Sequence, residues 1–192
     1  MAAEDHPRLQ AWRASDDQSW PGTESALIVE VPAAEPVIGR HRSELDANAG
    51  LGIPPHITIL TPFVPASGLG AQDRARLASL FASFEPFDFR LDHTDWFGTT
   101  VLWLGPRDPA PFRHLTEAVF AAFPQFPPFA GQFDEVVPHL TVGLESPIEA
   151  MRRAEREIKP NLPVIGRVAG VTLMSEVSPQ GRWEAVAYFP LG

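Results

Sequence analysis

The chain has 192 residues, none of them cysteine, and a formal net charge of −9 at pH 7. This length suits one domain with a substantial core, and a content of 44% hydrophobic and 20% charged residues is typical of a soluble globular protein. The lack of cysteine excludes disulfides, thiolate catalysis and cysteine-bound zinc, and the acidic charge disfavours binding of long duplex nucleic acid through many phosphates.

Residues 1–22 are polar and mildly acidic, and we interpret them as a flexible tail before a single bilobal domain over residues 23–192. They lack the basic start and apolar middle of a secretory signal, and no apolar run is long enough to cross a membrane. We therefore expect a cytoplasmic protein with no membrane partner, and we expect it to be a monomer.

The hydrophobic pattern alternates between strand and helix periods along the rest of the chain. The expected strands are 25–31, 56–63, 87–93, 99–105, 139–144 and two strands over 170–191 around the turn 178–181. The expected helices are 36–45, 71–84, 111–123 and 146–158, the last one capped by Ser146. Val37, His41 and Leu45 share one face of the first helix, and the third has an inward apolar stripe of Phe112, Leu115, Val119 and Phe123. Half-buried strands and hairpins predict an α+β fold with antiparallel sheets, and the chain divides into two roughly corresponding lobes.

One short phrase occurs twice, as "PPHITIL" from Pro54 and as "PHLTVG" from Pro138. Because alternate side chains of a strand share a face, His56 and Thr58 point one way and the aliphatic residues between them the other. His139 and Thr141 are placed in the same way. If the two lobes are related by a pseudo-two-fold axis, both His-Thr pairs line one central cleft.

Two imidazoles and two hydroxyls in one cleft suit phosphodiester chemistry. Displacement at phosphorus needs a base on the attacking oxygen and an acid on the leaving oxygen, and histidine serves as either near neutral pH. Threonine hydroxyls can donate hydrogen bonds to the phosphate oxygens. We therefore predict that His56, Thr58, His139 and Thr141 are catalytic, with no cofactor and no metal.

The paired His-x-Thr phrases and their spacing resemble the 2H phosphoesterase superfamily, which includes bacterial 2′-5′ RNA ligase-like proteins and cyclic phosphodiesterases. The stretch "GRHRSELDANAGLGIPPHITILTPF" and the closing "GRWEAVAYFPLG" are also similar to a 2′-5′ RNA ligase branch of that superfamily. The resemblance implies two α+β lobes with a cleft between them and a substrate that is a small phosphodiester or nucleotide, or an RNA end. Several members have a basic residue soon after one motif, and this chain has none there.

Three further residues are weaker candidates for substrate binding. Arg42 precedes the first motif by one loop, so we consider it a phosphate-binding cation, with a solvated helix surface as the alternative. Four aromatic residues are considered for stacking on a base: Phe63, Trp96, Phe97 and Trp103. We retain Phe63 and Trp96, with a place in the core as the alternative. We assign no role to His93 and His114, which we expect to be structural or exposed.

Three functions remain open at this point. The first is a metal-independent phosphodiesterase acting on 2′,3′-cyclic or 2′-5′-linked nucleotides or RNA ends. The second is a non-catalytic module of the same fold that binds nucleotides or RNA ends. The third, a metal-dependent hydrolase built on Asp134, Glu135 and His56, lacks a His-x-His or His-Glu-x-x-His spacing.

Overall fold

We describe a computed structural model of the chain, covering residues 24–64, 68–133, 135–177 and 181–192. The expected N-terminal tail lies outside the described residues, as do Asp134 and most of the turn expected at 178–181. No helix in the described part of the chain is long and apolar enough to cross a membrane.

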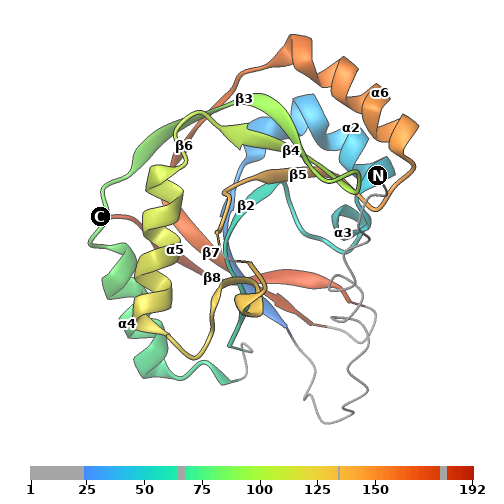
Figure 1. Cartoon of the computed structure of the whole chain (residues 1–192). Helices are drawn as coiled ribbons and strands as arrows, with labels where there is room; N and C mark the ends of the chain where they lie inside the picture. Colours follow the sequence, from blue (N-terminus) through green and yellow to red (C-terminus); the bar gives the residue numbers. More distant parts are fainter. Residues whose placement is uncertain (1–23, 65–67, 134, 178–180) are drawn as a thin grey trace.

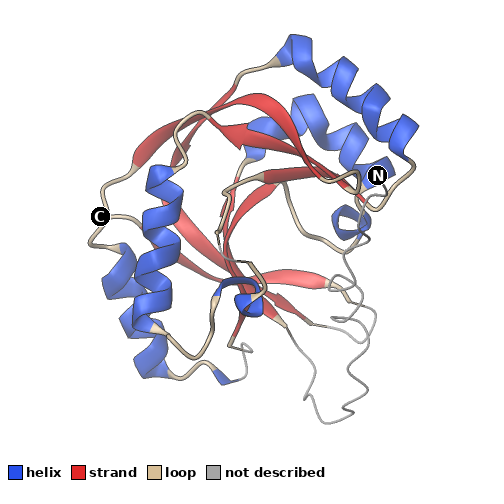
Figure 2. Cartoon of the chain, in the orientation of Figure 1, coloured by secondary structure: helices blue, strands red, loops and turns tan. Residues whose placement is uncertain are grey.

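The described strands form two antiparallel four-stranded sheets (Figures 1 and 2). Sheet A has the order β2-β1-β7-β8, with bounds His56–Phe63, Ser25–Glu30, Gly170–Glu176 and Trp183–Pro190. Sheet B has the order β5-β4-β3-β6, with bounds Leu140–Leu144, Val101–Pro106, Phe87–Phe97 and Val164–Val168. The expected α+β architecture of two lobes with antiparallel sheets is therefore confirmed.

The longer helices cover the two sheets in two groups (Figure 2). Helices α2 (Glu35–Leu45) and α6 (Ile148–Ile158) pack together on sheet B, where α2 contacts β5. Helices α4 (Ala71–Phe81) and α5 (Ala110–Ala122) pack together beside sheet A, against β8 and β2. The remaining helices of the described residues are single turns: η1 (Pro32–Ala34), α3 (Ala47–Gly50), η3 (Pro128–Gly131) and η4 (Lys159–Asn161).

The motif strands turn their aliphatic faces to the core, as the alternation predicts. Ile57, Ile59, Leu140 and Val142 are all at most 1% exposed. A register shift opposite β1, between the pairs Leu27–Leu60 and Ile28–Thr58, lets both Ile59 and Leu60 be buried although they are adjacent. The apolar stripe expected on α5 is also buried: Phe112, Leu115, Val119 and Phe123.

Two details differ from the sequence-based expectation. Strand β6 is not among the expected strands, because "VIGRV" is short, carries a glycine and follows a proline, which weakens the strand signal. The expected capping of α6 by Ser146 is wrong, because its hydroxyl donates instead to the backbone carbonyl of Leu45 at 2.9 Å. This bond ties the start of α6 to the end of α2.

Candidate active site

His56 begins β2 and is oriented by the backbone just before it. Its Nδ1 lies 2.8 Å from the carbonyl oxygen of Pro54. A carbonyl oxygen only accepts hydrogen bonds, so Nδ1 carries the proton and Nε2 is the nitrogen left for chemistry. In the sheet His56 pairs with Glu30 and Thr58 pairs with Ile28, so the motif is fixed by its register with β1.

His139 repeats this arrangement in the other lobe. Its Nδ1 lies 2.7 Å from the carbonyl oxygen of Val137, which is again two residues earlier. Thr141 follows on β5 and pairs with Trp103 on β4. The repeated phrase therefore encodes more than a residue pair, because the residues before each histidine fix the same tautomer in both lobes.

The two motif strands bring the histidines together. β2 and β5 are edge strands of their sheets and lie side by side near the centre of the molecule (Figure 1). His56 and His139 are close enough that a positive charge on His139 lowers the pKa of His56. All four motif side chains are partly buried. We call the face of each sheet that carries its motif residues the His-Thr face.

Burial keeps both imidazoles uncharged near neutral pH. It lowers the pKa of His56 from its ordinary value of 6.5 to about 4, although the bond to Pro54 acts in the opposite direction. The nearby charges of Arg42 and Asp46 act on His56 with opposite signs. Burial also lowers the pKa of His139, against its bond to Val137. A negative charge placed between the imidazoles would raise both pKa values.

Arg42 fits neither of its expected environments. It is only 3% exposed, so the solvated helix surface is wrong. Its guanidinium instead binds the buried carboxylate of Asp46, at 2.9 Å from Nη2 and 3.2 Å from Nε, and Nη2 lies 3.3 Å from the carbonyl oxygen of Ile53. Arg42 therefore holds the loop before His56 and is already paired, which argues against a phosphate-binding role.

The two aromatic candidates also lie away from the motif residues. Phe63 is 1% exposed and makes edge-on contacts with Phe123 and Phe126, so its ring belongs to the core. Trp96 is partly buried and bonds to Glu155 of α6, as Thr94 does on the same face of β3. This face is opposite to the His-Thr face, so neither ring is placed to receive a base.

The aromatic residues next to the motif are Phe97 and Trp103. The ring centroid of Phe97 lies 4.8 Å from that of His139 and 4.9 Å from that of Trp103. The sequence indicates that Phe97 and Trp96 lie on opposite faces of the sheet, because they are adjacent and adjacent strand residues point to opposite faces. The expected strand ends at residue 93, so the alternation of β3 does not reach this pair, and Phe97 rather than the expected Trp96 lies beside the motif histidine.

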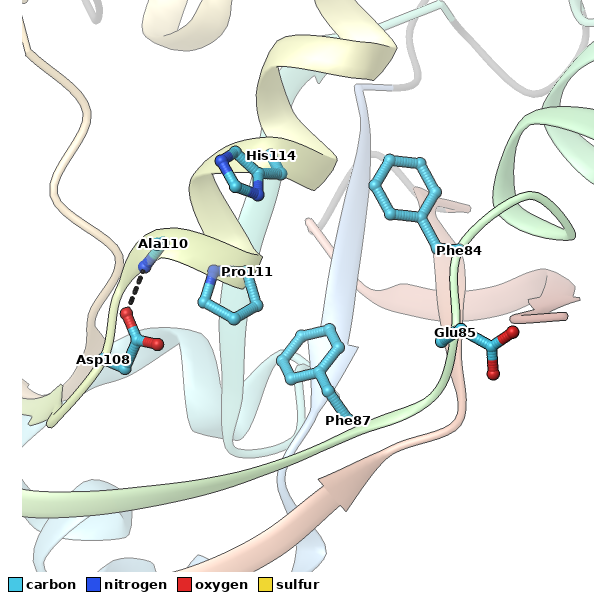
Figure 3. A pocket seen from close by; sticks show the side chains of 7 residues that line it. All are labelled: Phe84, Glu85, Phe87, Asp108, Ala110, Pro111 and His114. Carbon is cyan, nitrogen blue, oxygen red and sulfur yellow. Dashed lines mark hydrogen bonds between the residues drawn. The ribbon is translucent and has the colours of Figure 1, made fainter.

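Other hollows and polar groups lie elsewhere. The described residues contain no cluster of three His, Asp or Glu side chains suited to a metal ion. Glu135, considered for such a site, pairs with Arg113 at 3.0 Å. The hollow in Figure 3, between α5 and the segment that leads into β3, contains none of the motif residues. Its lining is Phe84, Glu85, Phe87, Asp108, Ala110, Pro111 and His114.

Comparison with known proteins agrees with this architecture. The fold defines an α+β protein of two lobes, like the solved structure of E. coli LigT complexed with 3′-AMP, which is 18% identical over 88% of this chain and 98% of that one, with a TM-score of 0.55. The structure of TT0787 of Thermus thermophilus is 20% identical over 87% and 97% of the two chains, with a TM-score of 0.56.

The sequence itself identifies the family. The family model of the 2′-5′ RNA ligase superfamily matches residues 29–179, and the chain belongs to that superfamily. Another solved structure, described as a phosphoesterase, is 19% identical over 88% of this chain and 99% of that one, with a TM-score of 0.54. A search of curated proteins finds no match.

Proposed function

We propose that this protein is a metal-independent phosphodiesterase that acts on 2′,3′-cyclic or 2′-5′-linked nucleotides or RNA ends by two-histidine acid–base catalysis. The observation that carries the proposal is the matched pair of bonds from Nδ1 of His56 and of His139 to backbone carbonyls. These bonds leave each Nε2 free to take up or release a proton. Membership of the superfamily supports phosphoesterase chemistry in general.

In the proposed reaction the phosphodiester lies between the two Nε2 atoms. One neutral imidazole removes a proton from the attacking water as its oxygen bonds to phosphorus. The other imidazole, protonated, gives its proton to the leaving oxygen as the opposite P–O bond breaks. Thr58 and Thr141 donate hydrogen bonds to the non-bridging oxygens, where negative charge increases in the transition state.

The lowered pKa values fit this scheme once the substrate is included. Burial favours the neutral form of both histidines. An anionic phosphodiester between them favours the protonated form of one, so binding supplies the condition for acid catalysis. The rate should therefore depend on pH as a bell-shaped curve. The structures of E. coli LigT complexed with 3′-AMP, NADP+ and ATP support a ligand of nucleotide size.

The deciding experiment measures turnover of a 2′,3′-cyclic nucleotide and a 2′-5′-linked dinucleotide. His56→Ala and His139→Ala should each lower kcat by ~10²–10⁴, the usual contribution of a positioned proton-transfer group. The double variant should lose much less than the product, because the two groups act as a unit. Thr58→Ala and Thr141→Ala should cost less. His114→Ala, on an exposed face of α5, is the matched control.

The same assay separates the alternatives. Turnover that a chelator does not change supports the proposal. Binding of the nucleotides without turnover would favour a non-catalytic module, and turnover abolished by a chelator would favour a metal-dependent hydrolase. Wild-type rates in either histidine variant would refute the two-histidine mechanism.

A further inference from the structure

A third histidine lies on the His-Thr face of sheet B. His93 of β3 pairs with Gly105 of β4. The β4–β5 register ends at the pair Leu104–Leu140, and one further step places Gly105 opposite His139. Paired residues of antiparallel strands share a face. His93, Gly105 and His139 therefore form a row from β3 across β4 to the residue that precedes β5.

Gly105 gives the imidazole of His93 its position. A Cβ at residue 105 would overlap Nε2 and Cε1 of His93, so the ring leans from β3 over β4. The ring centroid of Trp103 lies 6.0 Å from that of His93 and 5.9 Å from that of His139. The centroids of the two imidazoles are therefore no more than about 12 Å apart. One small substrate can reach both.

Asp92 fixes the orientation of the His93 imidazole through its Nδ1 atom. The carboxylate oxygen Oδ1 of Asp92 lies 2.9 Å from Nδ1 of His93, and Oδ2 lies 2.6 Å from Nε of Arg107. The hydrogen bond to His93 contributes most and the one to Arg107 next, and together they lower the pKa of Asp92, which stays ionised. Both of its oxygens are engaged. Nδ1 of His93 therefore carries the donated proton, and Nε2 is the nitrogen that lies over Gly105.

The cluster exposes an imidazole and a guanidinium to the solvent. The side chains of His93 and Arg107 are 48% and 64% exposed, whereas that of Asp92 is 20% exposed. The cluster places the Arg107 guanidinium and the His93 imidazole at the surface of a protein whose formal net charge is −9. Neither motif is followed by a basic residue and Arg42 is buried in its pair with Asp46, whereas Arg107 is an exposed guanidinium that Asp92 holds beside His93.

We infer that His93 and Arg107 form a second anion subsite, which binds a further phosphate of the substrate while His56 and His139 hold the reacting one. The inference rests on the proposed function and narrows its substrates to phosphodiesters that carry an additional phosphate group, such as a nucleoside 2′,3′-cyclic phosphate with a 5′-phosphate. Asp92 is a positioning residue, and Gly105 provides the space. Asp95, two residues after His93 on β3, accepts a hydrogen bond from the backbone N–H of Trp96 at 2.8 Å.

The test compares a nucleoside 2′,3′-cyclic phosphate with the same compound bearing a 5′-phosphate. For the wild type the phosphorylated compound should have the lower KM. His93→Asn should reduce this KM ratio by about five- to tenfold, as expected for loss of a partly exposed, charge-assisted hydrogen bond. Gly105→Ala, which displaces the same ring, should act in the same direction. His114→Asn makes the same substitution at an exposed site on α5 and should leave the ratio unchanged.

Calorimetric binding of both compounds is measured in parallel, so the subsite is tested even without turnover. No turnover of either compound by the wild type would refute the proposed function, while a His93-dependent preference in binding would still support the subsite. An unchanged ratio in His93→Asn, in both KM and Kd, would overturn the inference and leave the proposed function intact. Equal weakening for both compounds would overturn it as well, because it would show a structural effect.

Discussion

The imidazole of His56 should make the stability of the protein depend on pH. Its pKa is about 4 in the folded protein and near 6.5 when unfolded, so between these values the unfolded chain binds more protons. This contribution is complete above pH 6.5 and is lost as the pH falls to 4, by up to roughly 3 kcal/mol. We expect the Tm to fall between pH 7 and pH 4.5, measured by thermal denaturation.

The control is the variant His56→Asn, which cannot titrate. Its Tm should fall less over the same interval, although the depressed pKa of His139 and the carboxylates still contribute. His114→Asn should keep the wild-type pH dependence. Parallel curves for the wild type and His56→Asn would contradict the lowered pKa of this group.

The buried ion pair of Arg42 and Asp46 should be costly to break. Asp46→Asn keeps an oxygen that can cap α3, where Asp46 Oδ1 accepts from the backbone of Asn48 at 3.1 Å, but it leaves Arg42 as an unpaired buried charge. We expect the free energy of unfolding in urea to fall by ~3–5 kcal/mol. Glu44→Gln, which breaks the exposed pair with Arg40, should cost under ~1 kcal/mol. Equal losses would show that burial of the pair contributes little.

For single residues, the sequence identifies the members of the repeated motif better than it identifies the contacts of residues outside the motif. The motif residues can be recognised because the same short phrase occurs twice in the chain. These residues are His56, Thr58, His139 and Thr141. For Arg42 and Phe63, the local sequence is compatible with either a core or a surface environment. The choice depends on contacts with Asp46 and with Phe123 and Phe126, which spacing alone does not specify.

Strand β3 offers a test of face assignment with two adjacent aromatic residues. Phe97 contacts the ring of His139, so Phe97→Ala should raise KM for nucleotide substrates or lower kcat. Trp96 bonds to Glu155 behind the sheet, so Trp96→Phe should mainly lower stability, by ~1 kcal/mol for a lost hydrogen bond. Enzyme kinetics and urea denaturation of both variants measure the two effects. The reverse pattern would mean that the faces are assigned wrongly.

Elements with one strong period are predictable from the sequence. The buried stripe of α5 and the buried residues Ile57 and Val142 follow directly from spacings of 3.6 and 2. Helix α2 is harder, because the expected stripe through Val37 and His41 is displaced by one position, and Ile38, Arg42 and Leu45 are buried. A paired arginine can occupy a buried stripe, which a hydrophobic pattern treats as polar surface.

For the whole molecule, the sequence predicts two related lobes but does not specify how they are joined. The repeat implies that β2 and β5 are equivalent, and they are both edge strands that meet between the sheets. The sequence does not predict which sheet each helix covers. Helix α2, for example, follows a strand of sheet A but packs on sheet B. Such crossovers depend on long-range packing that leaves no local signal.

The order of strands in sheet A has a consequence for how quickly the protein becomes active. Sheet B is drawn from one continuous stretch, Phe87–Val168, whereas sheet A pairs β1 with β7, so that Ser25 lies opposite Ser175. Pairing across such a long loop is slow, because closure entropy must be overcome first. On the ribosome, β5, which directly follows His139, can pair with β4 before β7 and β8 have been synthesised. During that time β1 lacks its partner β7. Strands β7 and β8, which follow all of sheet B in the sequence, therefore complete the sheet that holds His56.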